Sequence, residues 1–180
     1  MKFNEGRRGV ELHIHLDGAF RPSTVFKFAK LRGFPVPGAN ENEFENHLIV
    51  KQPNSLASFL KTFDYLLPPI AGSAEAIAQT TLDFLEDCVN KAGLCYVEPR
   101  FSPQLLQGTT LSADEVTKTV LDALERSSQK FDIQYRAILC TMRQNPEWSD
   151  EVLSLAKAYQ PHGIVAVDVA GELLLDTVFG

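Results

Sequence analysis

The sequence predicts an α/β domain built on a parallel sheet, and two observations carry this prediction. Four short segments, at Val10–Asp17, Leu94–Phe101, Ile133–Met142 and Gly163–Ala170, are almost continuously apolar, as is typical of strands buried on both faces. Segments with helical periodicity separate them, and this order indicates βαβ units. Four such strands form either a small open sheet or half of a (β/α)₈ barrel. A whole barrel needs roughly 250 residues, and the chain has 180.

Composition excludes several other classes of protein. Hydrophobic residues make up 44% of the chain and charged residues 22%, which is a globular balance and not a disordered one. The net charge of −6, without a basic stripe, argues against nucleic acid as a partner. No apolar run approaches the roughly 18–20 residues of a membrane span, and Met1–Gly9 does not resemble a secretory signal. Cys88, Cys95 and Cys140 lack metal-binding spacing, so we expect reduced thiols in a cytoplasmic protein.

The connection after the first strand is long and helical. A first helix is expected to begin at Pro22, which suits a first helical turn, and to stop at Gly33. Residues 34–71 then form a predicted helical insertion. Its apolar side chains recur at i, i+3, i+4 and i+7, at Leu56, Phe59, Leu60 and Phe63. This stripe is either core packing or part of a lid over the carboxyl ends of the strands.

Three further helices alternate with the remaining strands. The segment Ala74–Val89 follows a 3.6-residue period, and Gly93 stands where that helix would stop. Ser112 and Glu115 have the spacing of a capping box. Ser149 is expected to cap a last helix that reaches Tyr159.

The end of the first strand carries the strongest signal for chemistry. Because side chains alternate faces along a strand, His13, His15 and Asp17 should share one face. Leu12, Ile14 and Leu16 should share the other. Two imidazoles beside a carboxylate suit a divalent metal, and zinc in particular. The alternative is a pair of core or rim histidines with ordinary hydrogen bonds.

Other polar groups cluster at the ends of the later strands, where ligands of α/β folds bind. Arg143 follows the third strand, and Asp168, Gly171 and Glu172 close the fourth. Arg143 and Glu172 could equally form a salt bridge at the rim, and Gly171 could be a simple turn glycine. On the second strand we expect Glu98 and Arg100 to form a structural ion pair, because they alternate with apolar neighbours. The aromatic rings of Phe59 and Phe63 could face a flat ring from the insertion.

Several segments together resemble the adenosine deaminase family. They lie in the family's order and span Val10 to Glu172, nearly the whole chain. The segments are Glu11–Gly18, Arg21–Thr24, Ser55–Tyr65, Tyr96–Pro103, Cys140–Arg143 and Ala166–Glu172.

The resemblance implies a metal-dependent (β/α)₈-barrel hydrolase that acts on cyclic amidine C–N bonds. Such enzymes convert adenosine or 2′-deoxyadenosine to the inosine compound and ammonia in purine nucleoside salvage, with zinc activating a water for attack at C6. By resemblance, His13 and His15 match zinc ligands, and His15 also lies against the substrate. Asp17 matches the residue that binds the ribose 5′-hydroxyl, and Gly171 the backbone contact to purine N3. The apolar wall beside the nucleoside matches Leu56, Phe59 and Phe63.

The chain departs from the family pattern at two places. Pro99 lies inside the second strand, where the missing N–H could demand a bulge. Residues 173–180 do not resemble the family, so we expect a partial barrel domain over 1–172 and an unrelated tail. A third zinc histidine, a glutamate proton donor, a further catalytic histidine and an Asp-Asp pair are not found. His47 and His162 match no ligand, and we expect both to be solvated.

These departures lead us to expect an incomplete zinc site and an inactive chain. Four strands also leave two open sheet edges, so self-association is a further expectation. Three alternatives remain open: another metal-dependent hydrolase of the same superfamily, a non-catalytic nucleoside-binding or interaction protein, and a fragment that does not fold stably.

Overall fold

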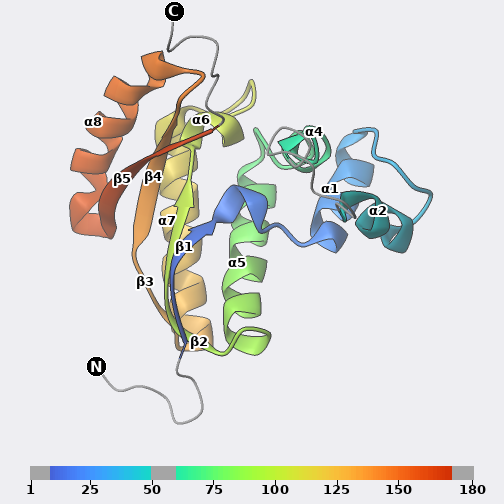
Figure 1. Ribbon diagram of the computed structural model, residues 1–180, viewed down its shortest axis with the longest axis horizontal. Helices are drawn as coiled ribbons and strands as arrows, with labels where there is room; N and C mark the ends of the chain where they lie inside the picture. Colours follow the sequence, from blue (N-terminus) through green and yellow to red (C-terminus); the bar gives the residue numbers. More distant parts are fainter. Residues whose placement is uncertain (1–8, 50–59, 172–180) are drawn as a thin grey trace, which may run out of the picture.

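The computed structural model describes residues 9–49 and 60–171. Its strands form one parallel sheet in the order β1-β2-β4-β5, with the short β3 paired to β2 (Figure 1). All four predicted strands are therefore confirmed, with the third divided in two. The strands are β1 (Gly9–His15), β2 (Leu94–Phe101), β3 (Gln134–Tyr135), β4 (Ala137–Met142) and β5 (Ile164–Ala170).

Pro99 explains why the third predicted strand is divided at Arg136. The amide of Arg136 donates to the carbonyl of Val97, and the ladder resumes where Arg100 pairs with Ile138. In this register the amide of residue 99 would donate back to the carbonyl of residue 136, but proline has no N–H. On its other side, Pro99 pairs with Ile14, next to a register shift between Glu11 and Ile14. Beside Pro99, the extra residue therefore lies in β1 and not in β2.

The helices begin and end largely where their caps predict. Pro22 lies in the first turn of α1, and Gly33 follows it with a φ of 72°. Ser112 and Glu115 form the predicted capping box at the start of α7. The helices are α1 (Pro22–Arg32), α2 (Glu41–Leu48), α4 (Phe63–Leu66), α5 (Ala74–Asn90), α6 (Pro103–Leu106), α7 (Ala113–Phe131) and α8 (Ser149–Tyr159).

The cap predicted for the last helix is wrong. Ser149 is the first residue of α8, and Trp148 precedes it without a capping side-chain hydrogen bond. A 3₁₀ turn at Pro146–Trp148 leads directly into α8. The Ser149 hydroxyl instead lies 3.0 Å from the Thr141 hydroxyl at the end of β4. It therefore fastens the helix to the strand.

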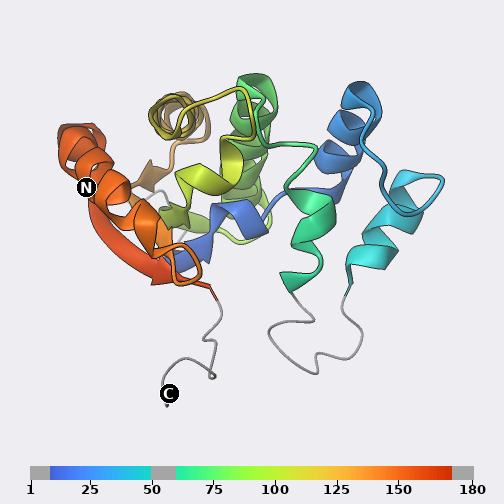
Figure 2. The ribbon, with the colours of Figure 1, turned by 90° about the horizontal axis from the view of Figure 1, so that it is seen from above.

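The core lies between the sheet and helices α5, α7 and α8. Val97, Phe101 and Leu139 from the strands are completely buried, and Leu85 of α5 and Leu124 of α7 pack in the same cluster. Helices α1 and α2 lie to one side of the sheet, and α8 lies at the opposite end (Figures 1 and 2). The part of the chain that the structure describes contains no helix that is long and apolar enough to cross a membrane.

Arg21 joins the first helix to α5. Its guanidinium donates to Asp83, Glu86 and Asp87, which lie along one side of α5. Burial alone would raise the pKa of Asp87, but hydrogen bonds from Arg21 and Lys91 lower that pKa below its usual value. The network fixes the start of α1 relative to α5.

Strands β1 and β5 are the two edges of the described sheet. Both expose apolar side chains, as the sequence predicts. On β5 the exposed residues alternate with Asp168 and so lie on the opposite face from it. The exposed side chains are Val10 and Leu12 of β1 and Val165, Val167 and Val169 of β5.

Candidate metal centre

Strand β1 places its two histidines side by side at its carboxyl end. The ring centroids of His13 and His15 are 5.9 Å apart. The register shift in β1 lies between Glu11 and Ile14 and so includes His13, whose amide donates to the carboxylate of Glu11 at 2.8 Å. Ile14 packs against the core between the two histidines, whereas Leu12, which was expected to share its face, is 54% exposed. The expectation that the two imidazoles occupy one pocket is confirmed, because both line the same cavity.

Asp17 is held beside the histidines in the 3₁₀ turn that follows β1. Its carboxylate Oδ2 accepts a hydrogen bond from the amide of Ser102 at 3.2 Å, and Oδ1 lies 3.7 Å from Nδ1 of His15. The residue is only 4% exposed. A buried carboxylate fixed at one oxygen by a backbone amide keeps its other oxygen in a defined direction.

Asp168 of β5 completes a group of three potential ligands. One ligand atom each from His13, His15 and Asp168 lie within 4.8 Å of one another. The sequence marks Asp168 as an acidic residue at a strand end, but it does not identify it as a ligand. The signal that could have found it is its place at the carboxyl end of a parallel strand, because all such ends meet at one edge of the sheet.

Arg100 pairs with this aspartate, and the predicted Glu98–Arg100 ion pair is wrong. Nη1 of Arg100 lies 2.5 Å from Oδ2 of Asp168. Glu98 instead accepts a hydrogen bond from the Tyr96 hydroxyl. Burial, reinforced by that hydrogen bond, raises the pKa of Tyr96 to about 12. The curvature of the sheet brings β5 within reach of β2, and a pattern within one strand cannot show this.

Hydrogen bonds stabilise the negative charge of Asp168. Burial alone would raise the pKa of its carboxyl, but hydrogen bonds from Arg100 and from the amide of Val169 lower that pKa below its usual value. The carboxylate is therefore ionised at neutral pH and has lone pairs available to a cation.

The three ligands open onto a cavity of about 800 Å³ at the carboxyl ends of the strands. Four of the residues predicted to bind substrate line it: His15, Asp17, Phe63 and Gly171. Leu56 and Phe59 lie outside the described residues, and so does Glu172. The cavity is apolar on the side of the insertion, where Leu60, Phe63, Leu67 and Leu105 line it.

The backbone conformation at position 171 and the space around it both require glycine. Its φ is 97°, which favours glycine, and a Cβ there would lie 2.1 Å from Oε1 of Gln144. Its carbonyl accepts a hydrogen bond from Arg143 at 3.0 Å. The glycine therefore allows Gln144 to pack against the chain at the rim of the cavity.

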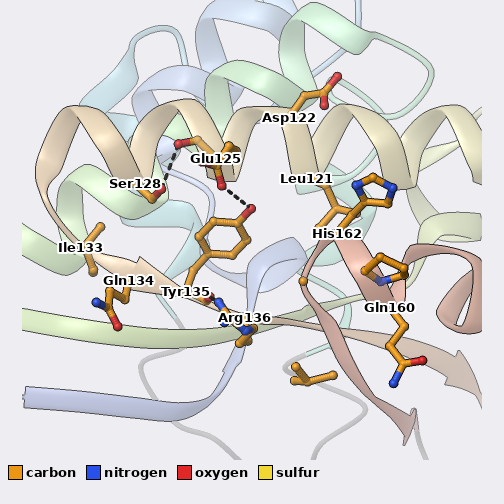
Figure 3. Close-up of a pocket in the computed structure, with 13 residues that line it drawn as sticks. Leu121, Asp122, Glu125, Ser128, Ile133, Gln134, Tyr135, Arg136, Gln160 and His162 are labelled. Carbon is orange, nitrogen blue, oxygen red and sulfur yellow. Dashed lines mark hydrogen bonds between the residues drawn. The ribbon is translucent and has the colours of Figure 1, made fainter. Parts of the chain in front are cut away.

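A second cavity of about 700 Å³ lies at the amino ends of the strands, between α7 and the start of β5 (Figure 3). Tyr135 and Glu125 meet there through a hydrogen bond of 3.1 Å. His162 is exposed at this cavity, and His47 is exposed elsewhere, so the expectation that both are solvated is confirmed. Potential metal ligands converge only at the first cavity among residues 9–49 and 60–171.

The residues of the first cavity fit a zinc ion. Two imidazole nitrogens and one carboxylate oxygen form a donor set that catalytic zinc uses in proteins. The distances among the three ligand atoms are compatible with one ion between them. Among the described residues, Arg100 is the charged group that hydrogen-bonds a side chain of this set, through Asp168.

Comparisons with known proteins agree with this geometry. A family model described as adenosine deaminase matches residues 9–175. Adenosine deaminase from Gallus gallus is 41% identical over 182 residues, covering 94% of this chain and 51% of that protein. The chain spans about half the length of the curated relatives it matches.

Two solved structures are similar in fold. Adenine deaminase from Arthrobacter aurescens superimposes with a TM-score of 0.79 at 19% identity, covering 94% of this chain and 50% of that one. An amidohydrolase from Burkholderia ambifaria, solved with bound Zn, gives a TM-score of 0.79 at 16% identity, covering 97% and 49%. The prediction that the sheet is half of a (β/α)₈ barrel is therefore confirmed.

Proposed function

The chain belongs to the adenosine deaminase family, and from this premise we propose that it carries the amino-terminal part of a site for purine nucleoside deamination. The reaction is the hydrolysis of adenosine or 2′-deoxyadenosine to the inosine compound and ammonia. The observation that carries the proposal is the convergence of His13, His15 and Asp168 on a cavity with one apolar side. A zinc ion held there would supply an activated water for attack at C6 of the purine.

The other cavity residues would recognise the nucleoside. Asp17 would bind the ribose 5′-hydroxyl through the carboxylate oxygen that the Ser102 amide leaves free. Gly171 would offer its backbone to purine N3, and its lack of a side chain supports this role. Phe63 would pack against the flat purine ring, and Leu56 and Phe59 would extend the same wall.

The insertion over residues 34–71 would act as a lid. Leu60, Phe63 and Leu67 from this segment line the apolar side of the cavity. A lid of this kind excludes water from a site and so strengthens its electrostatic interactions.

We expect the chain alone to turn over little or no substrate. Loss of ammonia needs a proton donor whose pKa lies near neutrality. Burial raises the pKa of the Cys140 thiol, which lines the cavity, to about 12. A zinc ion would occupy His13 and His15, so the described cavity would supply metal ligands and binding groups rather than the proton donor.

The cavity and the exposed sheet edges each imply a binding partner. Purine nucleosides would bind in the cavity, and the exposed edge strands β1 and β5 would support self-association. Three buried free cysteines support a cytoplasmic location, where thiols stay reduced.

Calorimetry of the zinc-loaded chain tests the proposal. Adenosine should bind about tenfold more tightly than adenine, because the base alone lacks the hydroxyl that Asp17 accepts from. The variant Asp17→Ala should abolish this difference. Equal binding of adenosine and adenine by the parent chain would contradict the proposal. Preference for an unrelated cyclic amide over nucleosides would instead favour another hydrolase of the superfamily.

A further inference from the structure

We propose that the second cavity, at the amino ends of the strands, binds a dipeptide with free termini. The inference goes beyond the proposed function, because this cavity shares no lining residue with the cavity of the candidate metal centre. Its volume of about 700 Å³ is sufficient for a ligand of this size. Helix α7, strand β3 and the 3₁₀ turn Gln160–His162 before β5 surround it (Figure 3).

Three almost completely buried side chains give this cavity an apolar floor. They are Leu121 of α7, Ile133 and Tyr135 of β3. The Tyr135 side chain reaches from β3 to α7, where its hydroxyl donates to Oε2 of Glu125 at 3.1 Å (Figure 3). An apolar side chain of a ligand can pack on this floor.

Opposite charges lie at the two ends of Tyr135. At its hydroxyl end is the Glu125 carboxylate, which a second hydrogen bond, from Gln129 at 2.7 Å, also holds in place. At its backbone end, Nη1 of Arg136 donates to the Tyr135 carbonyl at 2.7 Å. Both charges act on the same ring: burial and the charge of Glu125 raise the pKa of Tyr135 to about 12, and the charge of Arg136 opposes that rise.

These two charges do not neutralise each other. Among the described residues, neither Glu125 nor Arg136 belongs to an ion pair, although both line the cavity. The carboxylate oxygens of Glu125 retain lone pairs, and the guanidinium of Arg136 has further N–H groups to donate. An ammonium group would therefore pair with Glu125 and a carboxylate with Arg136.

The separation of the two charges selects the length of the ligand. They lie apart by about the length of a tyrosine side chain, because each is hydrogen-bonded to one end of Tyr135. A single amino acid carries its two charges closer together, whereas two extended residues span roughly 7 Å. The side-chain amides of Gln134 and Gln160 line the same cavity and can donate to and accept from the central peptide group. A dipeptide matches all of these groups at once.

Matched ligands test the inference without relying on activity. The ¹⁵N-labelled full chain is titrated, with chelator present, with leucyl-leucine, N-acetyl-leucyl-leucine, leucyl-leucinamide and leucine. Leucyl-leucine should shift the backbone amide resonances of Tyr135 and Gly163. The other three should bind at least about tenfold more weakly, because blocked peptides lose a charged contact and leucine cannot reach both charges.

Variants assign each terminus of the peptide to its residue. Arg136→Met should weaken leucyl-leucine by about tenfold but leave leucyl-leucinamide unchanged, because the amide has no carboxylate. Glu125→Gln should weaken leucyl-leucine and leave the acetylated peptide unchanged. Arg126→Met removes an exposed arginine of α7 that is not among the lining residues, and it should change neither. Should Glu125→Gln fail to fold by circular dichroism, Arg136→Met carries the test, because Arg136 is exposed.

Three results would overturn the inference: no shift at Tyr135 and Gly163 with leucyl-leucine up to its solubility limit, equal affinity for free and blocked peptides, or shifts confined to the candidate metal centre. A chain that binds the dipeptide as expected but no nucleoside would support this inference and contradict only the proposed function. Binding of nucleosides without the dipeptide would contradict only this inference.

Discussion

The carboxylate of Asp17 accepts a hydrogen bond from the backbone amide of Ser102 at 3.2 Å, which fastens the turn after β1 to the end of β2. Both residues are buried, so the amide has no access to water if its acceptor is removed. The Asp17 side chain therefore contributes both to the stability of the fold and to the candidate site.

Asp17→Ala should lower the free energy of unfolding by about 1–3 kcal/mol, because it leaves a buried donor unpaired. Asp17→Asn should cost less, since its amide oxygen can still accept from Ser102. Urea denaturation of the two variants, with exposed Asp64→Ala as a control, measures the difference. Equal destabilisation by Ala and Asn at position 17 would show that the hydrogen bond contributes little.

His13→Ala and His15→Ala should each reduce zinc affinity by at least about tenfold, because each removes one of three convergent ligands. His162→Ala removes an exposed histidine at the far end of the strands and should leave affinity unchanged. Chelator competition compares the three variants. An equal loss in His162→Ala would place the metal elsewhere.

Purified chain supplied with zinc should show no measurable loss of adenosine absorbance. The reason is that zinc would occupy the two histidines of the described cavity, and burial raises the pKa of the Cys140 thiol there to about 12, too high for an efficient proton donor. Sustained turnover that a chelator abolishes and His13→Ala removes would refute this expectation.

Arg21→Met should destabilise the chain by about 1 kcal/mol at pH 7, the scale of a partly exposed ion-pair network. Because the folded-state pKa of Asp87 is depressed, its contribution to stability is present above the unfolded pKa of about 3.9 and is lost as the pH falls through the folded-state value. The difference between parent and variant should therefore shrink in acid. Urea melts at pH 7 and at about pH 3 test the sign, and a difference that grows in acid would contradict it.

The edge strand β5 should support self-association, which size-exclusion chromatography with light scattering can measure. Val167→Lys introduces a charge on an exposed apolar face of that strand and should favour the monomer. Leu153→Lys changes an exposed leucine of α8 rather than of an edge strand, and should not. A stable monomer in the parent chain at all concentrations would defeat the prediction.

Local patterns in the sequence predict most of the fold and part of the site. The period of two in β1 brings His13 and His15 together, and the caps at Pro22 and Ser112 locate two helices. These signals succeed because each depends on residues only a few positions apart. The cap predicted at Ser149 is wrong because the chain enters α8 directly from a preceding 3₁₀ turn, which a local capping pattern does not reveal.

Contacts across the sheet could not be predicted in this way. Arg100 and Glu98 lie two residues apart on one strand, so local reasoning pairs them, yet Arg100 binds Asp168 on a strand it does not neighbour. That contact depends on the strand order and on the curvature of the sheet. The division of the third strand at Arg136 likewise needs the register in which the amide missing from Pro99 would have donated to the carbonyl of Arg136.

The pairing of β1 with β2 joins parts of the chain that are made far apart in time. Leu12 and Arg100, which meet through a hydrogen bond, are 88 positions apart in sequence. During translation, the strand that carries His13 and His15 must wait for β2 before it can enter the sheet, and closing such a long loop slows folding. Until then both imidazoles are displayed on an unpaired apolar segment of the nascent chain. The strand that bears the histidines is therefore open to chaperones and to aggregation while the residues up to β2 are synthesised.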